Sequence, residues 1–370
     1  MTAWVHTISP FALRLGEDWG LRWYGLAYAA GFLAGWAILR ALARRGLVLI
    51  PAHRVGDAII VVALGVIIGG RLGYAVFYRP ELFWSVTRSL PWWELLAVHE
   101  GGMSSHGGMI GVIVGAWVVS RGWKKEGMSE REGRTPVLHV LDALALVAPV
   151  GLFFGRVANF VNAELLGRVV AGPGEPAPWW SVKFPQERLE PGAPDLSLEQ
   201  QRGLAAVVES VRLPTETFRD GYARLVGEIQ SGRPGLADAL SPYLASRYPS
   251  QLLQAVAEGV VLGVVLAWVW RRPRKPGVVG AWFLVVYGVL RIVTEVWRLP
   301  DAHLAVQRPL GLTRGQWLSV AMVGTGVAAL AWVSRRVTGK LGGWRTDATP
   351  RAIGGAIGGE GGAVPPRGDA

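Results

Sequence analysis

The chain has 370 residues, of which 51% are hydrophobic and only 18% charged, with a formal net charge of +11. A globular protein averages roughly 25% charged residues, and a mean hydropathy of +0.31 is high for a soluble domain. The sequence has no cysteine, which excludes a disulfide scaffold, a cysteine nucleophile, thiolate metal ligands and an iron–sulfur cluster.

Taken in chain order, the apolar segments predict seven membrane-spanning helices, since about 20 apolar residues cross a bilayer core. They cover residues 23–39, 58–78, 107–120, 137–155, 252–270, 277–296 and 315–334. The second and third are the weaker predictions because their uncharged runs are short. The expected fold class is an all-α polytopic membrane protein.

The Lys and Arg residues predict the orientation, because short cytoplasmic loops carry an excess of both. Seventeen lie on one set of helix flanks, among them Arg40 and Arg335, against seven on the opposite set. We therefore expect the N-terminus outside and the C-terminus in the cytoplasm. Basic loops between apolar runs also indicate membrane lipid, and no nucleic acid, as the partner of the charge.

Composition divides the chain into four parts. Residues 1–170 hold the first four helices and residues 251–338 the last three. Between them, residues 171–250 contain ten of the 23 prolines and no run apolar enough to span, which predicts an extracytoplasmic soluble insertion with an amphipathic helix near Leu196–Val211. Residues 339–370 are rich in Gly and Pro and are predicted to form a disordered cytoplasmic tail.

Ionisable residues in the spans require an explanation, because each raises the free energy of membrane insertion by about 2.5–3.5 kcal/mol at the membrane centre. They are Arg71, His106, Asp142, Arg156, Glu164, Glu258, Arg291 and Glu295. One explanation is that some pair with each other and only hold helices together. The other is functional, because most of them fall into local constellations in the outer half of the predicted membrane, with Arg71 alone at mid-span.

The first constellation places His106 before Gly107 and Gly108. Glycine lets backbone N–H groups approach an anion closely, so both are candidates for binding one. Histidine titrates near neutrality, as a general base should. The structural alternative is a flexible loop entering a helix.

The second constellation is Arg156, Asn159 and Asn162, followed by Glu164. A spacing of three places the first three on one helix face. A guanidinium beside amides suits a phosphate or phosphodiester. The alternative is an arginine at a helix end that extends to the lipid headgroups.

Two further signals lie near the outer ends of other spans. Tyr287, Arg291 and Glu295 recur every four residues, so that Arg291 can bind an anion while Glu295 orients it. The alternative is a buried pair that fixes packing. Tyr24 follows Arg22-Trp23 and could equally belong to an aromatic belt. The stretch Tyr248-Pro-Ser-Gln-Leu precedes the fifth span, with Ser250 as a helix cap.

Together and in this order, these strings resemble the prolipoprotein diacylglyceryl transferase family, over about residues 6–335 outside the insertion. The most specific match is Gly155–Arg168, similar to the family signature Gly-Arg-x-Gly-Asn-Phe-x-Asn-Gly-Glu. Ala158 and Ala163 stand where that signature has Gly. Further departures are Ser105 in place of Phe, Tyr248 in place of His, and Leu253-Gln254 in place of Tyr-Glu. The change at Tyr248 indicates that this position is not the catalytic base.

The resemblance implies an enzyme that transfers the diacylglyceryl group of phosphatidylglycerol to the lipobox cysteine of preprolipoprotein signal peptides. Glycerol phosphate is released and a thioether forms. It also implies the bacterial inner membrane, with the active site on the extracytoplasmic side and a gap between helices for the acyl chains. The thiol belongs to the substrate, which fits a chain without cysteine, and no cofactor or metal is expected.

The resemblance also assigns roles, because the thiol must become a thiolate and the leaving phosphate must be stabilised. The implied catalytic residues are His106 as base, Arg156 and Arg291 on the phosphate, and Tyr24. The implied substrate-binding residues are Asn159, Asn162, Tyr287, Gly107, Gly108 and Arg71, with Glu164 and Glu295 holding the arginines. A multi-pass transporter, with polar residues on both faces, and an inactive homologue that binds lipid or signal peptide are the alternatives.

Overall fold

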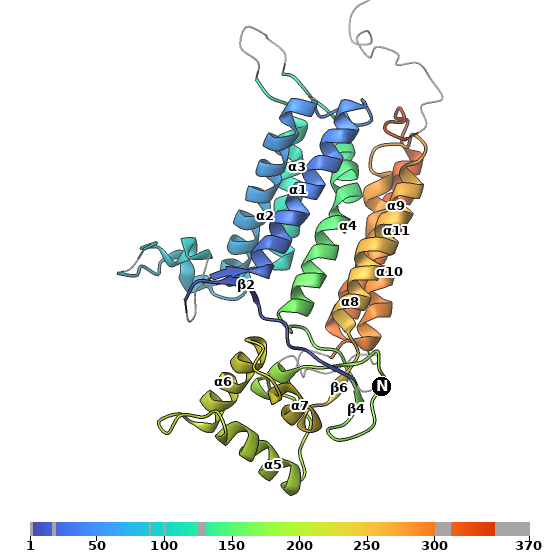
Figure 1. Cartoon of the computed structure of the whole chain (residues 1–370). Helices are drawn as coiled ribbons and strands as arrows, with labels where there is room; N and C mark the ends of the chain where they lie inside the picture. Colours follow the sequence, from blue (N-terminus) through green and yellow to red (C-terminus); the bar gives the residue numbers. More distant parts are fainter. Residues whose placement is uncertain are drawn as a thin grey trace, which may run out of the picture.

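The structure is a computed structural model that describes residues 3–16, 20–88, 90–98, 101–124, 131–299 and 312–344. Within these ranges, apolar helices form a bundle whose successive members run in opposite directions along one axis (Figure 1). They are α1 (Trp23–Arg44), α2 (Val55–Phe77), α3 (Ser105–Ser120), α4 (Val137–Val161), α8 (Ser250–Gln254) continuing into α9 (Leu262–Trp270), α10 (Val278–Thr294) and α11 (Arg314–Arg335). Six of these helical stretches are long and apolar enough to cross a membrane, and α3, with 16 residues, is shorter. The predicted fold class is confirmed.

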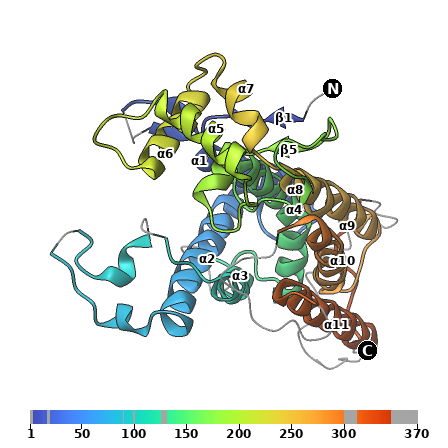
Figure 2. The same cartoon turned by 90° about the horizontal axis from the view of Figure 1, so that it is seen from below.

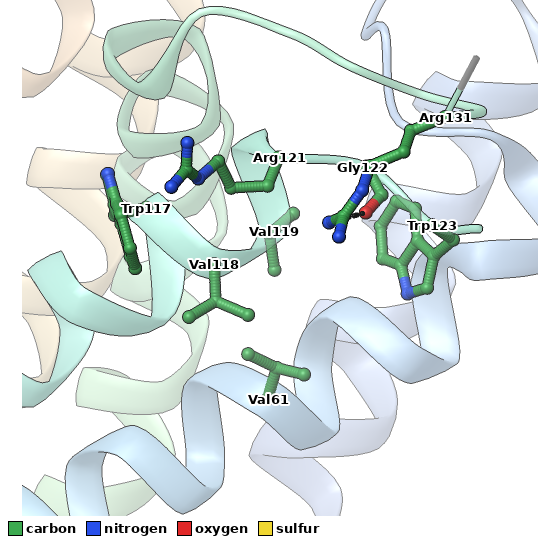
Figure 3. A pocket seen from close by; sticks show the side chains of 8 residues that line it. All are labelled: Val61, Trp117, Val118, Val119, Arg121, Gly122, Trp123 and Arg131. Carbon is green, nitrogen blue, oxygen red and sulfur yellow. Dashed lines mark hydrogen bonds between the residues drawn. The ribbon is translucent and has the colours of Figure 1, made fainter. Parts of the chain in front are cut away.

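The end of the bundle with the loops after α1, α3, α9 and α11 corresponds to the set of helix flanks that is richer in Lys and Arg, and we call it the basic end. Here four arginines lie over Trp rings of their own helices, at 4.4–4.9 Å: Arg40 on Trp36, Arg121 on Trp117, Arg271 on Trp268 and Arg336 on Trp332. Arg121 and Arg131 also flank a cavity of about 330 Å³ with Val61 and Val118 at its base (Figure 3). Such Arg–Trp pairs are typical of a membrane–water interface.

Polar residues near the basic end serve the packing of the helices. Asp142 accepts hydrogen bonds from the backbone N–H groups of Gly277 and Gly280, both at 2.7 Å, and so caps the start of α10. His139 accepts from the Leu49 N–H at 3.3 Å. The structural explanation therefore holds for Asp142.

Helices α2 and α3 lie side by side, and glycine residues of one helix face glycine residues of the other (Figure 2). The facing residues are Gly65, Gly69 and Gly73 on α2 and Gly107, Gly111 and Gly115 on α3. A Cβ atom added at Gly111 would lie 1.9 Å from the Gly65 carbonyl oxygen. Small residues let membrane helices approach this closely, so α3 is held to α2 by backbone contact.

The opposite end of the bundle, the site end, carries a small unit that we call the cap (Figure 1). Its sheet has the order β1-β5-β6-β4, with β1 parallel to β5 and the other pairs antiparallel. The strands are β1 (Trp4–Val5), β4 (Val169–Ala171), β5 (Val182–Lys183) and β6 (Ser246–Arg247), and a separate hairpin joins β2 (Phe11–Arg14) to β3 (Gly20–Arg22). Because β1 joins the sheet, the N-terminal segment packs with residues 171–250.

Three helices complete the cap: α5 (Leu198–Glu209), α6 (Phe218–Gln230) and α7 (Leu236–Leu240). The helix expected near Leu196–Val211 is thus present as α5, and it begins with a Ser197–Gln200 capping box. Leu204, Leu225 and Leu240 are among the buried residues of a hydrophobic cluster separate from that of the bundle. The division of the chain at 171–250 stays a prediction.

The predicted disorder from residue 339 onward is wrong for residues 339–344. Leu341 exchanges both backbone hydrogen bonds with Arg274, at 2.7 and 3.0 Å. The Trp344 indole N–H donates to the Ala267 carbonyl at 3.0 Å. This short segment therefore folds back on the α9–α10 loop, and the rest of the predicted tail lies outside the described residues.

Candidate active site

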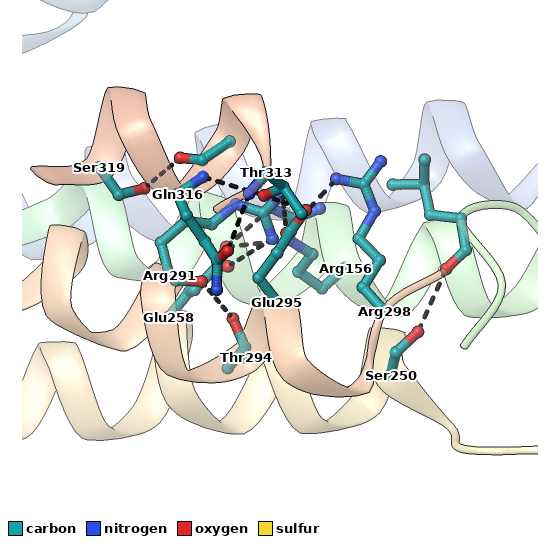
Figure 4. A network of polar contacts seen from close by, with 12 residues as sticks. Arg156, Ser250, Glu258, Arg291, Thr294, Glu295, Arg298, Thr313, Gln316 and Ser319 are labelled. Atoms are coloured by element: carbon teal, nitrogen blue, oxygen red, sulfur yellow. Dashed lines mark hydrogen bonds and ion pairs between the residues drawn. The ribbon is translucent and has the colours of Figure 1, made fainter. Parts of the chain in front are cut away.

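A network of arginines and glutamates lies between α4, α10 and the helix that contains Glu258 (Figure 4). Glu258 is fully buried, and its Oε2 lies 2.9 Å from both Nε and Nη2 of Arg156. Its Oε1 lies 3.8 Å from Nη1 of Arg291. One carboxylate therefore neutralises part of two guanidinium groups, which are themselves 16% and 13% exposed.

Glu295 extends this network toward the end of α10. Its Oε2 lies 3.0 Å from Nη2 of Arg291 and 3.8 Å from Nη1 of Arg298. Its Oε1 accepts a hydrogen bond at 3.4 Å from Thr313, the N-cap of α11, where the helix dipole favours a negative charge. Three guanidinium groups share two carboxylates, so the network carries a net positive charge.

Glu258 points into the network because it lies in a π-helical turn and not in a regular α-helix. Residues Ala255–Val261 form a π-helical turn between α8 and α9. Such turns are rare and occur most often at functional sites. Gly259 permits the close approach of α4 here, since a Cβ atom on it would lie 2.6 Å from Cβ of Phe153. This local distortion places the Glu258 carboxylate against Arg156.

A second polar group adjoins the network and contains Tyr24. Asn159 Nδ2 donates to the Tyr24 hydroxyl at 3.2 Å and to Glu164 Oε2 at 3.0 Å. Asn162 Nδ2 donates to Glu164 Oε1 at 3.3 Å. Tyr287 precedes Arg291 by one turn of α10. The structure thus brings together residues that the sequence predicted on α1, α4 and α10.

The predicted partners of the arginines are partly wrong. Glu295 does hold Arg291. Among the described residues, Glu164 binds the two asparagine amides and no arginine, because it follows the end of α4 and turns back on it. Glu258 takes the place expected for Glu164. Glu258 stands out in the sequence as an ionisable residue in a span, but no motif connects it to Arg156.

The backbone conformation of the loop after α4 explains why the family signature has glycine at the position of Ala163. Ala163 and Leu165 both have φ of +54°, in the left-handed region that favours glycine. The signature has Gly at the position of Ala163, and glycine adopts this conformation without the steric cost that a Cβ atom causes. Ala158 lies inside α4, where glycine has no such advantage.

At the expected anion site, the structure gives Gly107 and Gly108 partners within the protein. Both backbone N–H groups are already used at the start of α3: Gly107 N–H donates to Ser104 Oγ at 3.3 Å and Gly108 N–H to the Ser104 carbonyl at 2.9 Å. Gly107 instead packs against Gly69. His106 is exposed at the same end of the bundle, and none of the hydrogen bonds or ion pairs among the described residues joins it to the arginine network.

Arg71 does not lie at mid-span as expected. It is less than two turns from the end of α2, and its guanidinium donates to backbone carbonyls of residues 94–102. The acceptors are Leu95 at 2.9 Å, Gly101 at 2.6 Å, Gly102 at 3.2 Å and Glu94 at 2.6 Å. Arg71 therefore fixes the loop that precedes α3.

An apolar cavity of about 460 Å³ lies between α1, α2, α3, α4 and α10. Tyr28 and Phe283 are among its lining residues. The Tyr28 ring lies 5.1 Å from the Tyr24 ring, and Phe283 stacks on Tyr287 at 5.5 Å. Aromatic pairs thus connect this cavity to both polar groups of the site.

Comparison with known proteins identifies a family. The family model described as "Prolipoprotein diacylglyceryl transferase" matches residues 10–332. A protein of Bdellovibrio bacteriovorus named phosphatidylglycerol–prolipoprotein diacylglyceryl transferase is 40% identical over 359 residues, covering 92% of this chain and 97% of its own length.

Further relatives carry the same name. The protein of Paramagnetospirillum magneticum is 35% identical over 332 residues, covering 89% of this chain and 95% of its own length. That of Ruegeria pomeroyi is 34% identical over 343 residues, covering 86% and 93%. These matches confirm the resemblance drawn from the motifs.

Proposed function

This chain belongs to the prolipoprotein diacylglyceryl transferase family, and we propose that its arginine network binds the phosphate of phosphatidylglycerol during the transfer. The protein is a multi-pass membrane transferase that moves the diacylglyceryl group from phosphatidylglycerol to prolipoprotein. Our proposal adds that the acceptor is the thiol of the lipobox cysteine, and that glycerol phosphate leaves as the thioether forms.

The net positive charge of the network is the observation that supports this proposal. Arg156 and Arg291 each use only part of their donors on Glu258 and Glu295, and Nη1 of Arg291 is buried without a hydrogen-bond acceptor among the described residues. A phosphate oxygen would supply that acceptor. As the carbon–oxygen bond to the phosphate breaks, the two guanidinium groups stabilise the charge that develops on the leaving group.

The apolar cavity supports the placement of the lipid. With the phosphate at Arg156, the aromatic pairs Tyr24–Tyr28 and Phe283–Tyr287 lead from the polar groups into the cavity, where an acyl chain finds an apolar environment. Asn159 holds the Tyr24 hydroxyl beside this path. Tyr24 and Tyr287 would then orient the glyceryl carbon toward the incoming sulfur.

His106 is our candidate for the base that forms the thiolate. It lies at the exposed start of α3, at the same end of the bundle as the arginine network, where a peptide arriving from solvent can reach it. The site end would face outward from the bacterial inner membrane, because the basic end has the composition of cytoplasmic loops. The lipobox peptide would then enter beneath the cap.

A lipidation assay tests the proposal. Purified protein is mixed with phosphatidylglycerol and a lipobox peptide, and the peptide mass is followed for wild type, Arg156→Ala and the surface control Arg224→Ala. We expect a diacylglyceryl mass gain that is lost with Arg156→Ala and with a peptide carrying Ser in place of Cys, but kept in the control. Folded wild-type protein that gives no mass gain would indicate an inactive binding homologue instead.

A further inference from the structure

The loop Glu164–Arg168, which follows α4, is held through its carbonyl groups by the short segment Arg247–Gln251. Gln251 Nε2 donates to Glu164 O at 2.5 Å, Ser250 Oγ to Leu165 O at 3.1 Å, Arg247 Nη1 to Gly167 O at 3.0 Å and the Tyr248 N–H to Arg168 O at 3.1 Å. Donors from four residues of this five-residue segment thus occupy four of the five carbonyl groups of the loop.

The loop needs this support because its own backbone does not favour the conformation. Leu165, like the preceding Ala163, has a φ of +54°, and the left-handed region costs a non-glycine residue about 1–2 kcal/mol. Such conformations persist only where the surroundings hold them. The hydrogen bonds from Arg247–Gln251 supply that hold.

The segment is in turn anchored in the cap. Arg247 is 1% exposed, and its Nε lies 2.7 Å from Oε2 of Glu187, which is fully buried. Glu187 Oε1 also accepts from the Ala245 N–H at 2.8 Å. A buried ion pair is stable only when both groups are fully hydrogen-bonded, so Arg247 has a single well-defined position.

We infer that Arg247, Ser250 and Gln251, anchored by Glu187, are positioning residues for the Glu164 carboxylate. This inference rests on the proposed function, in which Asn159 orients Tyr24. Glu164 binds Asn159 and Asn162 at once, so a small displacement of the loop weakens both amide contacts and releases Tyr24. Through this chain of contacts, the cap sets the geometry of the polar group beside the arginine network.

Steady-state kinetics of Gln251→Ala and Arg247→Lys test the inference. Gln251→Ala removes one hydrogen bond and keeps the buried ion pair, whereas Arg247→Lys keeps the charge but cannot reach both Glu187 and Gly167 with fixed geometry. We expect kcat to fall about tenfold in each, with KM for the lipobox peptide unchanged. Arg224→Lys alters an exposed ion pair of the same cap and serves as the control, with wild-type kcat.

A double variant separates positioning from general stability. If Gln251 acts through Glu164, then Gln251→Ala combined with Glu164→Gln has the same kcat as Glu164→Gln alone. Additive losses, or wild-type kcat in both Gln251→Ala and Arg247→Lys, would overturn the inference.

Hydrogen exchange of the amides at 165–168 gives a readout independent of turnover. Faster exchange in Gln251→Ala than in Arg224→Lys supports the inference even if wild-type protein transfers nothing, in which case only the proposed function fails. Equal exchange in both variants refutes it.

Discussion

Glu258→Gln is the sharpest test of the arginine network, because it removes one charge and preserves the size of the side chain. In the structure the Glu258 carboxylate is fully buried, accepts a hydrogen bond from Arg156 Nε and forms an ion pair with Arg156 Nη2, with Arg291 at 3.8 Å. Gln offers only one acceptor oxygen and places an amide N–H₂ beside a guanidinium. Arginine cannot lose its proton, so two like charges are left without their shared partner.

Breaking a buried ion pair by removing one partner costs about 3–5 kcal/mol. Arg156 and Arg291 retain some solvent exposure, so we expect the lower end, about 3 kcal/mol of unfolding free energy. Without Glu258 the Arg156 and Arg291 guanidinium groups lose the partner that orients them toward the developing charge, and loss of one preorganised donor lowers kcat by about 10²–10³. We therefore expect transfer at least about a hundredfold slower than wild type.

Thermal unfolding in detergent measures the first quantity, and single-turnover transfer from phosphatidylglycerol to a lipobox peptide measures the second. Glu216→Gln is a matched control, since Glu216 also pairs with an arginine, on the cap surface away from the network. Its melting temperature and rate should remain near those of wild type. If Glu258→Gln matches this control in both measurements, the network neither stabilises the bundle nor binds the phosphate.

Three further predictions concern the fold. Ala163→Gly removes the strain of a φ of +54° and should raise the unfolding free energy by about 0.5–1 kcal/mol. Ala158→Gly inside α4 should lower the unfolding free energy by a similar amount. Equal effects of the two variants in thermal unfolding would contradict this prediction. Gly111→Ala forces α2 and α3 apart and should destabilise far more than Gly108→Ala, whose Cβ would lie 3.7 Å from its nearest neighbour; similar melting temperatures would refute the glycine contact. Burial lowers the pKa of His6 to about 4, so its neutral form stabilises the folded state above pH 6.5, and about 3 kcal/mol should be lost as the pH falls from 6.5 to 4. His6→Phe should flatten this pH dependence of unfolding, and an unchanged pH profile would assign it to other groups.

The sequence by itself determined which family the chain belongs to and, for six of the seven predicted spans, which segments form helices long and apolar enough to cross a membrane. Both are local properties: an apolar run is visible in about twenty consecutive residues, and the motif Gly155–Arg168 can be recognised without knowing its neighbours. The helix expected near Leu196–Val211 was equally local and is present as α5.

The tertiary structure decided which charges meet. Arg156 and Glu258 are 102 residues apart, and Tyr24 and Asn159 are 135 apart, so their pairing depends on how α1, α4 and the π-helical turn pack. The same packing turned Gly107 from an expected anion ligand into a helix contact with α2, because a backbone N–H that caps its own helix is no longer available to an anion. Hydropathy places a residue in the membrane, but only the contacts between helices determine which partner neutralises its charge.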